Sequence, residues 1–162
     1  MTIKVGDKLP ETTFTVMGSE GPKQVSTADV FGGKKVALFA VPGAYTPTCS
    51  KQHMPGYVAN AAEFKNQGYD MIACTSVNDI FVLTQWAKDT GAEGKITMLA
   101  DGSAEFAKKA GLELDLTARG LGMRSKRYAM IINDGVVSVL NVEEAPPQVD
   151  GSGAAAILAC KL

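Results

Sequence analysis

Cys49 is the residue in this sequence whose type and surroundings are best suited to covalent chemistry. It follows residues 42–48 (PGAYTPT), a segment that leaves an apolar stretch and leads into a stretch with helical composition. Cys49 therefore falls in the first turn of a predicted helix, where free backbone N–H groups and the positive end of the helix dipole favour a thiolate. Thr46 and Thr48 offer hydroxyl groups near the sulfur. A reactive thiolate and an inert, space-filling thiol are equally compatible with this position taken alone.

Three other kinds of chemistry would use Cys49 differently. A zinc site needs three or four ligands, but His53 is the only histidine, and Cys74 and Cys160 would have to converge on it. A cysteine hydrolase needs a histidine base held by Asn or Asp, and the sequence suggests no such partner for His53. Disulfide exchange of the thioredoxin type needs Cys-x-x-Cys, and the position three before Cys49 is Thr46. We therefore expect His53 to be a partly exposed helix residue that tunes the thiolate.

Strands are expected on both sides of Cys49 along the chain. Apolar runs of the length of buried strands cover residues 35–41, 69–77 and 97–100. Two further strands, at residues 127–133 and 136–142, flank Asp134-Gly135, a strong signal for a hairpin turn.

Helices are expected between these strands. Ser26 caps a short helix that runs through residue 31, and residues 48–66 form a helix that Pro55 kinks. The other helices are expected to begin at Asn78 or Asp79, at Ser103 (with an end at Gly111) and near Ser152, the last of these carrying Cys160.

This order of elements predicts an α/β protein with the thioredoxin fold. Strands that alternate with helices imply a parallel sheet, and the closing hairpin adds antiparallel strands, so we expect a mixed central sheet flanked by helices on both faces. A chain of 162 residues suggests a single domain over residues 1–162. Ligands bind beyond the carboxyl ends of the strands in such sheets, where residues 42–48 are expected to lie.

Composition excludes several classes of partner. Charged residues make up 20% of the chain and the net charge is −1, so no nucleic-acid partner is expected. The apolar run at residues 36–42 is far too short to cross a membrane, and residues 1–30 carry too many charges for a secretory signal. Three cysteines, an odd number, argue against a disulfide-stapled secreted domain. We expect a cytoplasmic protein, although an organelle protein without its leader would have the same features.

Several motifs resemble those of the peroxiredoxins. Pro42, Thr46 and Cys49 match the signature P-x-x-x-T-x-x-C of that family. Residues like those of its type II (atypical, peroxiredoxin-five-like) subfamily are found at 41–47, 49–56, 76–79 and 126–130, with Phe81 and Trp86 between them. The resemblance extends from about Ile3 to the last helix.

The resemblance implies a thiol peroxidase and assigns its catalytic residues. Cys49 would be the peroxidatic nucleophile that reduces hydrogen peroxide and organic hydroperoxides and becomes a sulfenic acid. Thr46 and Arg127 would be its catalytic partners, and Pro42 would shield it. A homodimer with its contact beside the active-site loop is also implied. The alternative is a peroxide sensor on the same scaffold, in which oxidised Cys49 signals to a partner protein.

Recycling of the sulfenic acid is where this sequence departs from part of the family. Some members carry a resolving cysteine in the loop before the last helix, and residues 142–153 contain none. Cys74 is a candidate resolving residue, but a cysteine in a buried strand is more often inert. We therefore expect an external thiol, glutathione with or without glutaredoxin, in preference to thioredoxin. No cofactor and no metal are expected.

Overall fold

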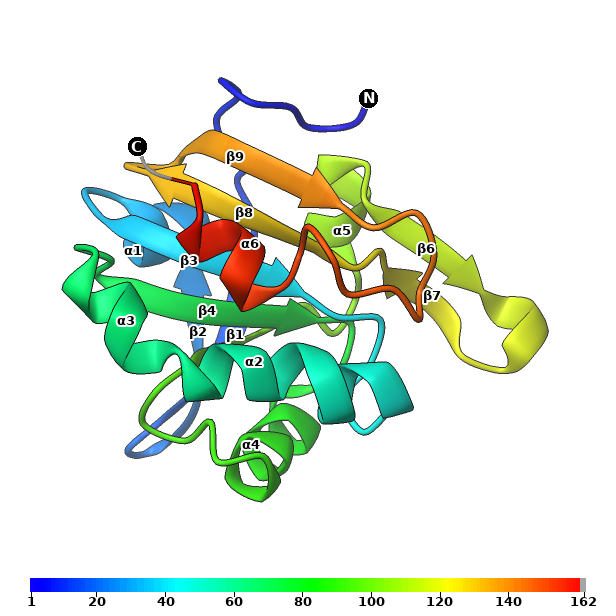
Figure 1. Ribbon diagram of the computed structural model, residues 1–162. Coiled ribbons are helices and arrows are strands. Elements are labelled where there is room, and N and C mark those ends of the chain that lie inside the picture. Colours follow the sequence, from blue (N-terminus) through cyan, green and yellow to red (C-terminus); the bar gives the residue numbers. More distant parts are fainter. Residues whose placement is uncertain (161–162) are drawn as a thin grey trace.

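The chain forms a seven-stranded mixed sheet with helices on both faces (Figure 1), as a computed structural model that describes residues 1–160 shows. From one edge to the other the strands are β2 (Gly21–Ser26), β1 (Thr13–Gly18), β5 (Thr97–Ala100), β4 (Met71–Ser76), β3 (Lys35–Ala40), β8 (Tyr128–Asn133) and β9 (Val136–Val142). The neighbours β3, β4 and β5 are parallel, and the other pairs are antiparallel. The predicted α/β thioredoxin fold is confirmed.

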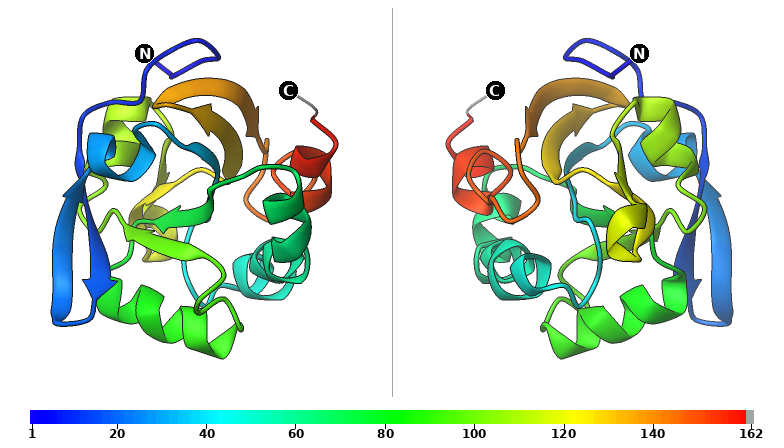
Figure 2. Two further views of the ribbon diagram at one scale, coloured as in Figure 1. Left: turned by 90° about the vertical axis from the view of Figure 1, so that its left-hand side faces the viewer. Right: turned by 90° about the vertical axis from the view of Figure 1, so that its right-hand side faces the viewer.

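The helices form two layers, one on each face of the sheet. Helices α1 (Thr27–Phe31) and α5 (Glu105–Ala110) pack on one face, and α2 (Met54–Ala59), α3 (Ala61–Asn66), α4 (Ile80–Asp89) and α6 (Ala154–Leu158) pack on the other. Figure 2 shows α1 and α5 on the opposite side of the sheet from α2 and α6. Within residues 1–160, no helix is both long and apolar enough to cross a membrane.

Strand β3 shows how the sequence fills both layers. Ala37 and Phe39 belong to the apolar core beneath α2, α4 and α6, whereas Val36, Leu38 and Ala40 belong to the core beneath α1 and α5. Successive side chains of a strand point to opposite faces, so a continuous apolar run is what a strand buried on both faces requires.

Local signals account for several element boundaries. Ser26 and Asp29 form the reciprocal hydrogen bonds of a capping box at the start of α1. Asp134 and Gly135 adopt positive φ angles of 48° and 75° between β8 and β9, as a tight hairpin turn requires.

Two hairpins were not predicted. Strands β1 and β2 pair with each other, and β1 joins the sheet beside β5, where Thr15 lies opposite Ala100. Strands β6 (Glu113–Leu116) and β7 (Gly122–Ser125) form a separate two-stranded sheet whose loop includes a short 3₁₀ turn, η2 (Thr117–Arg119). Phe14 is fully buried and Val16 packs against the same core, so period-2 alternation in β1 was a usable signal.

The predicted cap of α5 was wrong. Ala104, not Ser103, is at the N-cap position, and the carboxylate of Asp101 accepts hydrogen bonds from the backbone N–H groups of Phe106 (3.0 Å) and Ala107 (2.9 Å). Ala104 adopts a left-handed conformation (φ 58°), and this reversal brings the start of the helix over Asp101.

Candidate active site

A widened helical turn carries Cys49. Residues Cys49–His53 form a π-helical turn, η1, in which the Met54 N–H donates to the Cys49 carbonyl. Pro55 has no N–H group and its ring crowds the carbonyl of residue 51, so a regular α-helical ladder cannot pass this point. The proline was expected to kink the helix, and the structure shows that the turn before it is widened, a feature frequent at functional sites. Both ends of the turn, Cys49 and His53, are buried.

The Cys49 sulfur lies beside a guanidinium group. Cys49 is 0% exposed, and Nη2 of Arg127 donates to its Sγ at 3.0 Å. Arg127 immediately precedes β8 and is itself 3% exposed. The structure therefore brings together two predicted site residues that are 78 positions apart.

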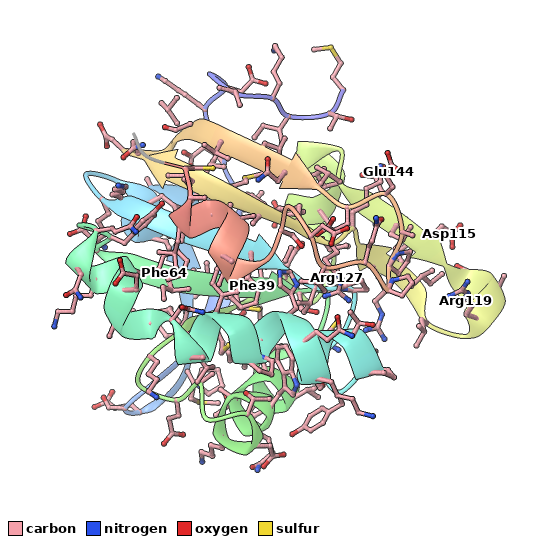
Figure 3. All side chains as sticks on the ribbon, viewed as in Figure 1. Phe39, Phe64, Asp115, Arg119, Arg127 and Glu144 are labelled. Carbon is pink, nitrogen blue, oxygen red and sulfur yellow. The ribbon has the colours of Figure 1, made fainter. Side chains whose placement is uncertain are left out.

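All three guanidinium nitrogens of Arg127 form hydrogen bonds. Its Nε donates to the Pro146 carbonyl at 2.9 Å, and its Nη1 bonds with Nδ1 of His53 at 2.8 Å. Figure 3 shows Arg127 between the loop that precedes α6 and the start of the helical segment that leads into α2. A planar guanidinium fixed at two nitrogens has a fixed direction for the third, which here is toward the sulfur.

His53 is fully buried, so the expectation of a partly exposed residue was wrong. Its Nε2 lies 2.8 Å from the Ser152 carbonyl, which also accepts a hydrogen bond from the Tyr57 hydroxyl at 2.7 Å. Burial, together with the nearby charge of Arg127, lowers the pKa of His53 to about 4. The imidazole is therefore uncharged at neutral pH.

Glu143 and Ser152 are site residues that sequence reasoning missed. One carboxylate oxygen of Glu143 accepts from the backbone N–H groups of Asp150 (2.6 Å) and Ser152 (3.0 Å) and from the Ser152 hydroxyl. Partial burial raises the pKa of Glu143, but these hydrogen bonds outweigh burial and lower it below its ordinary value. Nothing in residues 142–153 distinguishes Glu143 from the neighbouring Glu144, so local sequence held no signal for it.

The loop ahead of Cys49 presents the Thr46 hydroxyl in a defined orientation. The hydroxyl of Thr46 donates to the Gly43 carbonyl at 2.6 Å, which leaves its lone pairs free to accept. Pro42 is buried at the base of this loop, and its carbonyl accepts from Nη1 of Arg124 at 3.3 Å. Asn78, which follows β4, accepts from the Ala44 N–H at 3.0 Å. Pro42 and Thr46 thus lie on one braced loop.

Helix α4 braces the same region from the other side. The indole N–H of Trp86 donates to the Ser50 hydroxyl at 3.0 Å, and the Tyr45 hydroxyl donates to Asp89 at 2.6 Å. The hydrogen bond to Asp89 raises the pKa of Tyr45 to about 12. Tyr45 adopts a positive φ angle of 65°.

The other two cysteines have different surroundings. Cys74 lies in β4, is 0% exposed and belongs to the same apolar core as Cys49, and burial raises the pKa of its thiol well above the ordinary value. Cys160 lies beyond the end of α6 at Leu158, not within the helix as expected, and its thiol is 3.3 Å from the Ala156 carbonyl. All three cysteines are free thiols.

The comparison with known families agrees with this geometry. The sequence profile of the redoxin family matches residues 4–158. Relatives from plants and bacteria are peroxiredoxins at 45–52% identity. The chain belongs to the peroxiredoxin family. Within the family it belongs to the type II subfamily, as predicted.

Three relatives illustrate this membership. The chain is 52% identical to the chloroplastic peroxiredoxin-2E of Arabidopsis thaliana over 88% of its own length, and 45% identical to peroxiredoxin-2C of Oryza sativa subsp. japonica over 96% of both chains. The solved structure of reduced Prx3 from Vibrio vulnificus in complex with hydrogen peroxide is 49% identical, covers 98% of both chains and superposes with a TM-score of 0.93. This peroxiredoxin spans only 63% and 66% of the length of the chloroplastic relatives from Arabidopsis and rice.

Proposed function

We propose that this chain is a single-domain thiol peroxidase that reduces hydrogen peroxide and organic hydroperoxides with Cys49. The observation that carries the proposal is the 3.0 Å contact between Nη2 of Arg127 and the Cys49 sulfur at the start of a helical turn. The thiolate of Cys49 attacks one peroxide oxygen, an S–O bond forms and the O–O bond breaks. The products are the sulfenic acid of Cys49 and an alkoxide or hydroxide, which takes a proton from solvent.

Stabilisation of the leaving oxygen is the larger part of the catalysis. A thiol with an ordinary pKa of about 8.5 is ~3% ionised at pH 7, so complete ionisation would accelerate the reaction by at most ~30-fold. Enzymes commonly reach accelerations of ~10⁶-fold or more. The remainder must come from positioning and from donors aimed at the developing charge, and Arg127 supplies a fixed, permanently charged donor group there.

Thr46 and Pro42 complete the proposed site. Because the Thr46 hydroxyl already donates to the Gly43 carbonyl, its lone pairs are oriented to accept a hydrogen from the bound peroxide or from the thiol. Pro42, buried at the base of the loop, shields the sulfur from water.

An external thiol is the proposed reductant. Cys74 is enclosed in the sheet, and Cys160 lies beyond α6 with its thiol directed to the Ala156 carbonyl. Glutathione would attack the sulfenic acid with loss of water to form a mixed disulfide. The thiol of a second glutathione, or of glutaredoxin, would then attack this mixed disulfide. It would form a disulfide with the first glutathione and release the Cys49 thiol.

Two measurements test this function. Peroxide consumption is measured with glutathione, glutathione plus glutaredoxin, and thioredoxin as alternative reductants. Many rapid turnovers with glutathione are expected, whereas a sensor would cycle slowly. Intact-protein mass spectrometry after one equivalent of peroxide should show a gain of one oxygen on Cys49. A loss of two hydrogens would instead show an internal disulfide, and the external-thiol proposal would then be wrong.

A homodimer that uses the surface beside the active-site loop is part of the proposal. Two aromatic side chains are exposed there, Tyr45 (50%) on the loop and Phe81 (64%) on α4, and the Tyr45–Asp89 hydrogen bond joins these two elements. Light scattering should give a dimer mass for the native chain and a monomer mass for Phe81→Glu. A monomeric native chain would contradict the proposal.

A reducing compartment, with the cytoplasm as our first choice, fits this function. The three thiols are free, and the proposed cycle requires a supply of reduced thiol. A chloroplast, where two of the relatives are named as residing, meets the same chemical requirement.

A further inference from the structure

We infer that His53 is a positioning residue that, in its neutral form with the proton on Nε2, aims the Arg127 guanidinium at the Cys49 sulfur. The inference rests on the proposed roles of Cys49 and Arg127. His53 does not touch the sulfur in this arrangement; it acts through Arg127, to which it is bonded at 2.8 Å.

The chemistry of its two partners determines the tautomer of His53. The Ser152 carbonyl can only accept a hydrogen bond, so the Nε2 atom 2.8 Å away must carry a proton. The guanidinium of Arg127 can only donate, so Nδ1 must present its lone pair. Protonation of Nδ1 would place two N–H groups against each other and break the contact with Arg127.

The imidazole ring is itself held rigidly. Its centroid lies 4.9 Å from that of Phe39 and 5.7 Å from that of Tyr57, and the ring is 0% exposed. Together with the Ser152 carbonyl, these contacts fix where Nδ1 points. The direction of Nη2 toward Cys49 therefore depends on two acceptors outside the sulfur, His53 and the Pro146 carbonyl.

The loop between β9 and α6 anchors this chain of hydrogen bonds. Glu143 gathers the N–H groups of Asp150 and Ser152 on one carboxylate oxygen, which holds the Ser152 carbonyl over His53. The loop that carries a resolving cysteine in some relatives is thus connected in this chain to the Arg127 guanidinium.

Burial is the main reason that the His53 ring is neutral. Burial and the charge of Arg127, before β8, disfavour the imidazolium, and together they outweigh the Ser152 carbonyl and Glu143, after β9, which favour it. The other titratable groups nearby are the hydroxyl of Tyr57 on α2 and the thiols of Cys49 and Cys74, and burial raises the pKa values of Tyr57 and Cys74 so that both stay uncharged. Neutrality is what the acceptor role of Nδ1 requires.

Nuclear magnetic resonance of the untagged protein tests the tautomer directly, because the chain has one histidine. Long-range ¹⁵N–¹H spectra should show His53 as the Nε2–H tautomer, with no titration between about pH 5 and pH 8. A proton on Nδ1, or a midpoint near the ordinary value of about 6.5, would overturn the inference. This readout is independent of peroxidase activity, so it separates failure of the inference from failure of the proposed function.

Substitutions test the positioning role. His53→Leu removes both hydrogen bonds and should lower the rate of Cys49 oxidation by peroxide by ~10²-fold, the scale of losing one aligned donor. Alkylation of Cys49 by iodoacetamide has no leaving oxygen for Arg127 to stabilise and should change by less than ~3-fold. His53→Asn places a carbonyl oxygen near the position of Nδ1 and should recover at least ~10-fold of the lost rate.

Tyr57→Phe is the matched control. It removes the other donor to the Ser152 carbonyl while His53 and Arg127 keep their bond, so the peroxide rate should match that of the native chain. Equal losses in His53→Leu and Tyr57→Phe, or an Asn variant as slow as the Leu variant, would mean that His53 only supports the fold.

Discussion

Cys49 and Cys74 are both completely buried in one apolar core, yet their surroundings give them different chemistry. Cys74 lies in the middle of the sheet, with Phe39 of β3 and Met98 of β5 as its register partners on either side. Cys49 lies where the chain passes from a strand-end loop into a helical turn, with Nη2 of Arg127 at 3.0 Å. Burial is common to both, so burial does not make a cysteine reactive.

The difference lies in what each thiol meets when it ionises. A thiolate at Cys74 would be surrounded by apolar side chains, and burial accordingly raises the pKa of that thiol. A thiolate at Cys49 would face a charged donor that two other acceptors, the Pro146 carbonyl and Nδ1 of His53, hold in place. A fixed donor stabilises charge more strongly in a water-excluded site than in water. The low dielectric that disfavours a thiolate at Cys74 therefore strengthens the interaction between Arg127 and the sulfur of Cys49.

Replacing the sulfur of each cysteine with oxygen should give the largest difference in peroxide reduction between the two positions. Cys49→Ser should lower the rate of peroxide reduction by ~10⁴-fold or more, since a hydroxyl is a far weaker nucleophile than a thiolate. Cys74→Ser should leave the single-turnover oxidation of Cys49 unchanged. Stopped-flow measurement with one equivalent of peroxide checks both, and rapid peroxide reduction by folded Cys49→Ser would refute the proposed function.

Replacing Arg127 tests the feature that most distinguishes the surroundings of Cys49 from those of Cys74. Arg127→Lys keeps a positive charge but loses the planar fork, so it separates geometry from charge. We expect the second-order rate with peroxide to fall by ~10²-fold. If the Lys variant reacts at the native rate, charge alone sustains the site and the orientation of the fork has no role.

A smaller effect is expected from the acceptor on the loop. Thr46→Val removes the hydroxyl at nearly constant volume and should slow peroxide reduction by ~10-fold, the value of one hydrogen bond. Thr46→Ser keeps the hydroxyl and serves as the control. Equal rates for the two variants would place Thr46 outside the reacting geometry.

The pH dependence of the free energy of unfolding also distinguishes the Cys49 region, because that region contains the single histidine. The pKa of His53 is about 4 in the folded chain against an ordinary value of 6.5, so between these values the unfolded chain binds more protons. Stability therefore falls as the pH drops through this window, by about 2 kcal/mol between pH 7.5 and pH 5. Urea unfolding should show this loss of stability between pH 7.5 and pH 5 in the native chain. In His53→Asn the loss over the same range should be smaller by about 2 kcal/mol. Parallel curves for the two proteins would contradict the low pKa.

Local sequence was sufficient where a structure depends on near neighbours. The cap of α1 at Ser26, the hairpin turn at Asp134-Gly135 and strand β5 were all predicted within a residue, because each depends on caps, turn conformation or a short apolar run. The motif around Cys49 and its resemblance to the peroxiredoxins predicted the family, the fold and a pairing of Cys49 with Arg127 that the structure shows at hydrogen-bond distance.

Only the tertiary structure decided how the active-site region is held together. His53 contacts Arg127 across 74 positions and Ser152 across 99, and such contacts exist only once β8, β9 and the loop before α6 have packed against the helical turn. The same is true of β1 beside β5 and of Asp101 at the start of α5, where the partner arrives from another part of the chain. Neither the burial of His53 nor the hydrogen-bond partners of its ring follow from the local sequence, because both are set by packing. That is why the sequence pointed to the sulfur that we propose reacts, and the structure to the residues that we infer aim Arg127 at it.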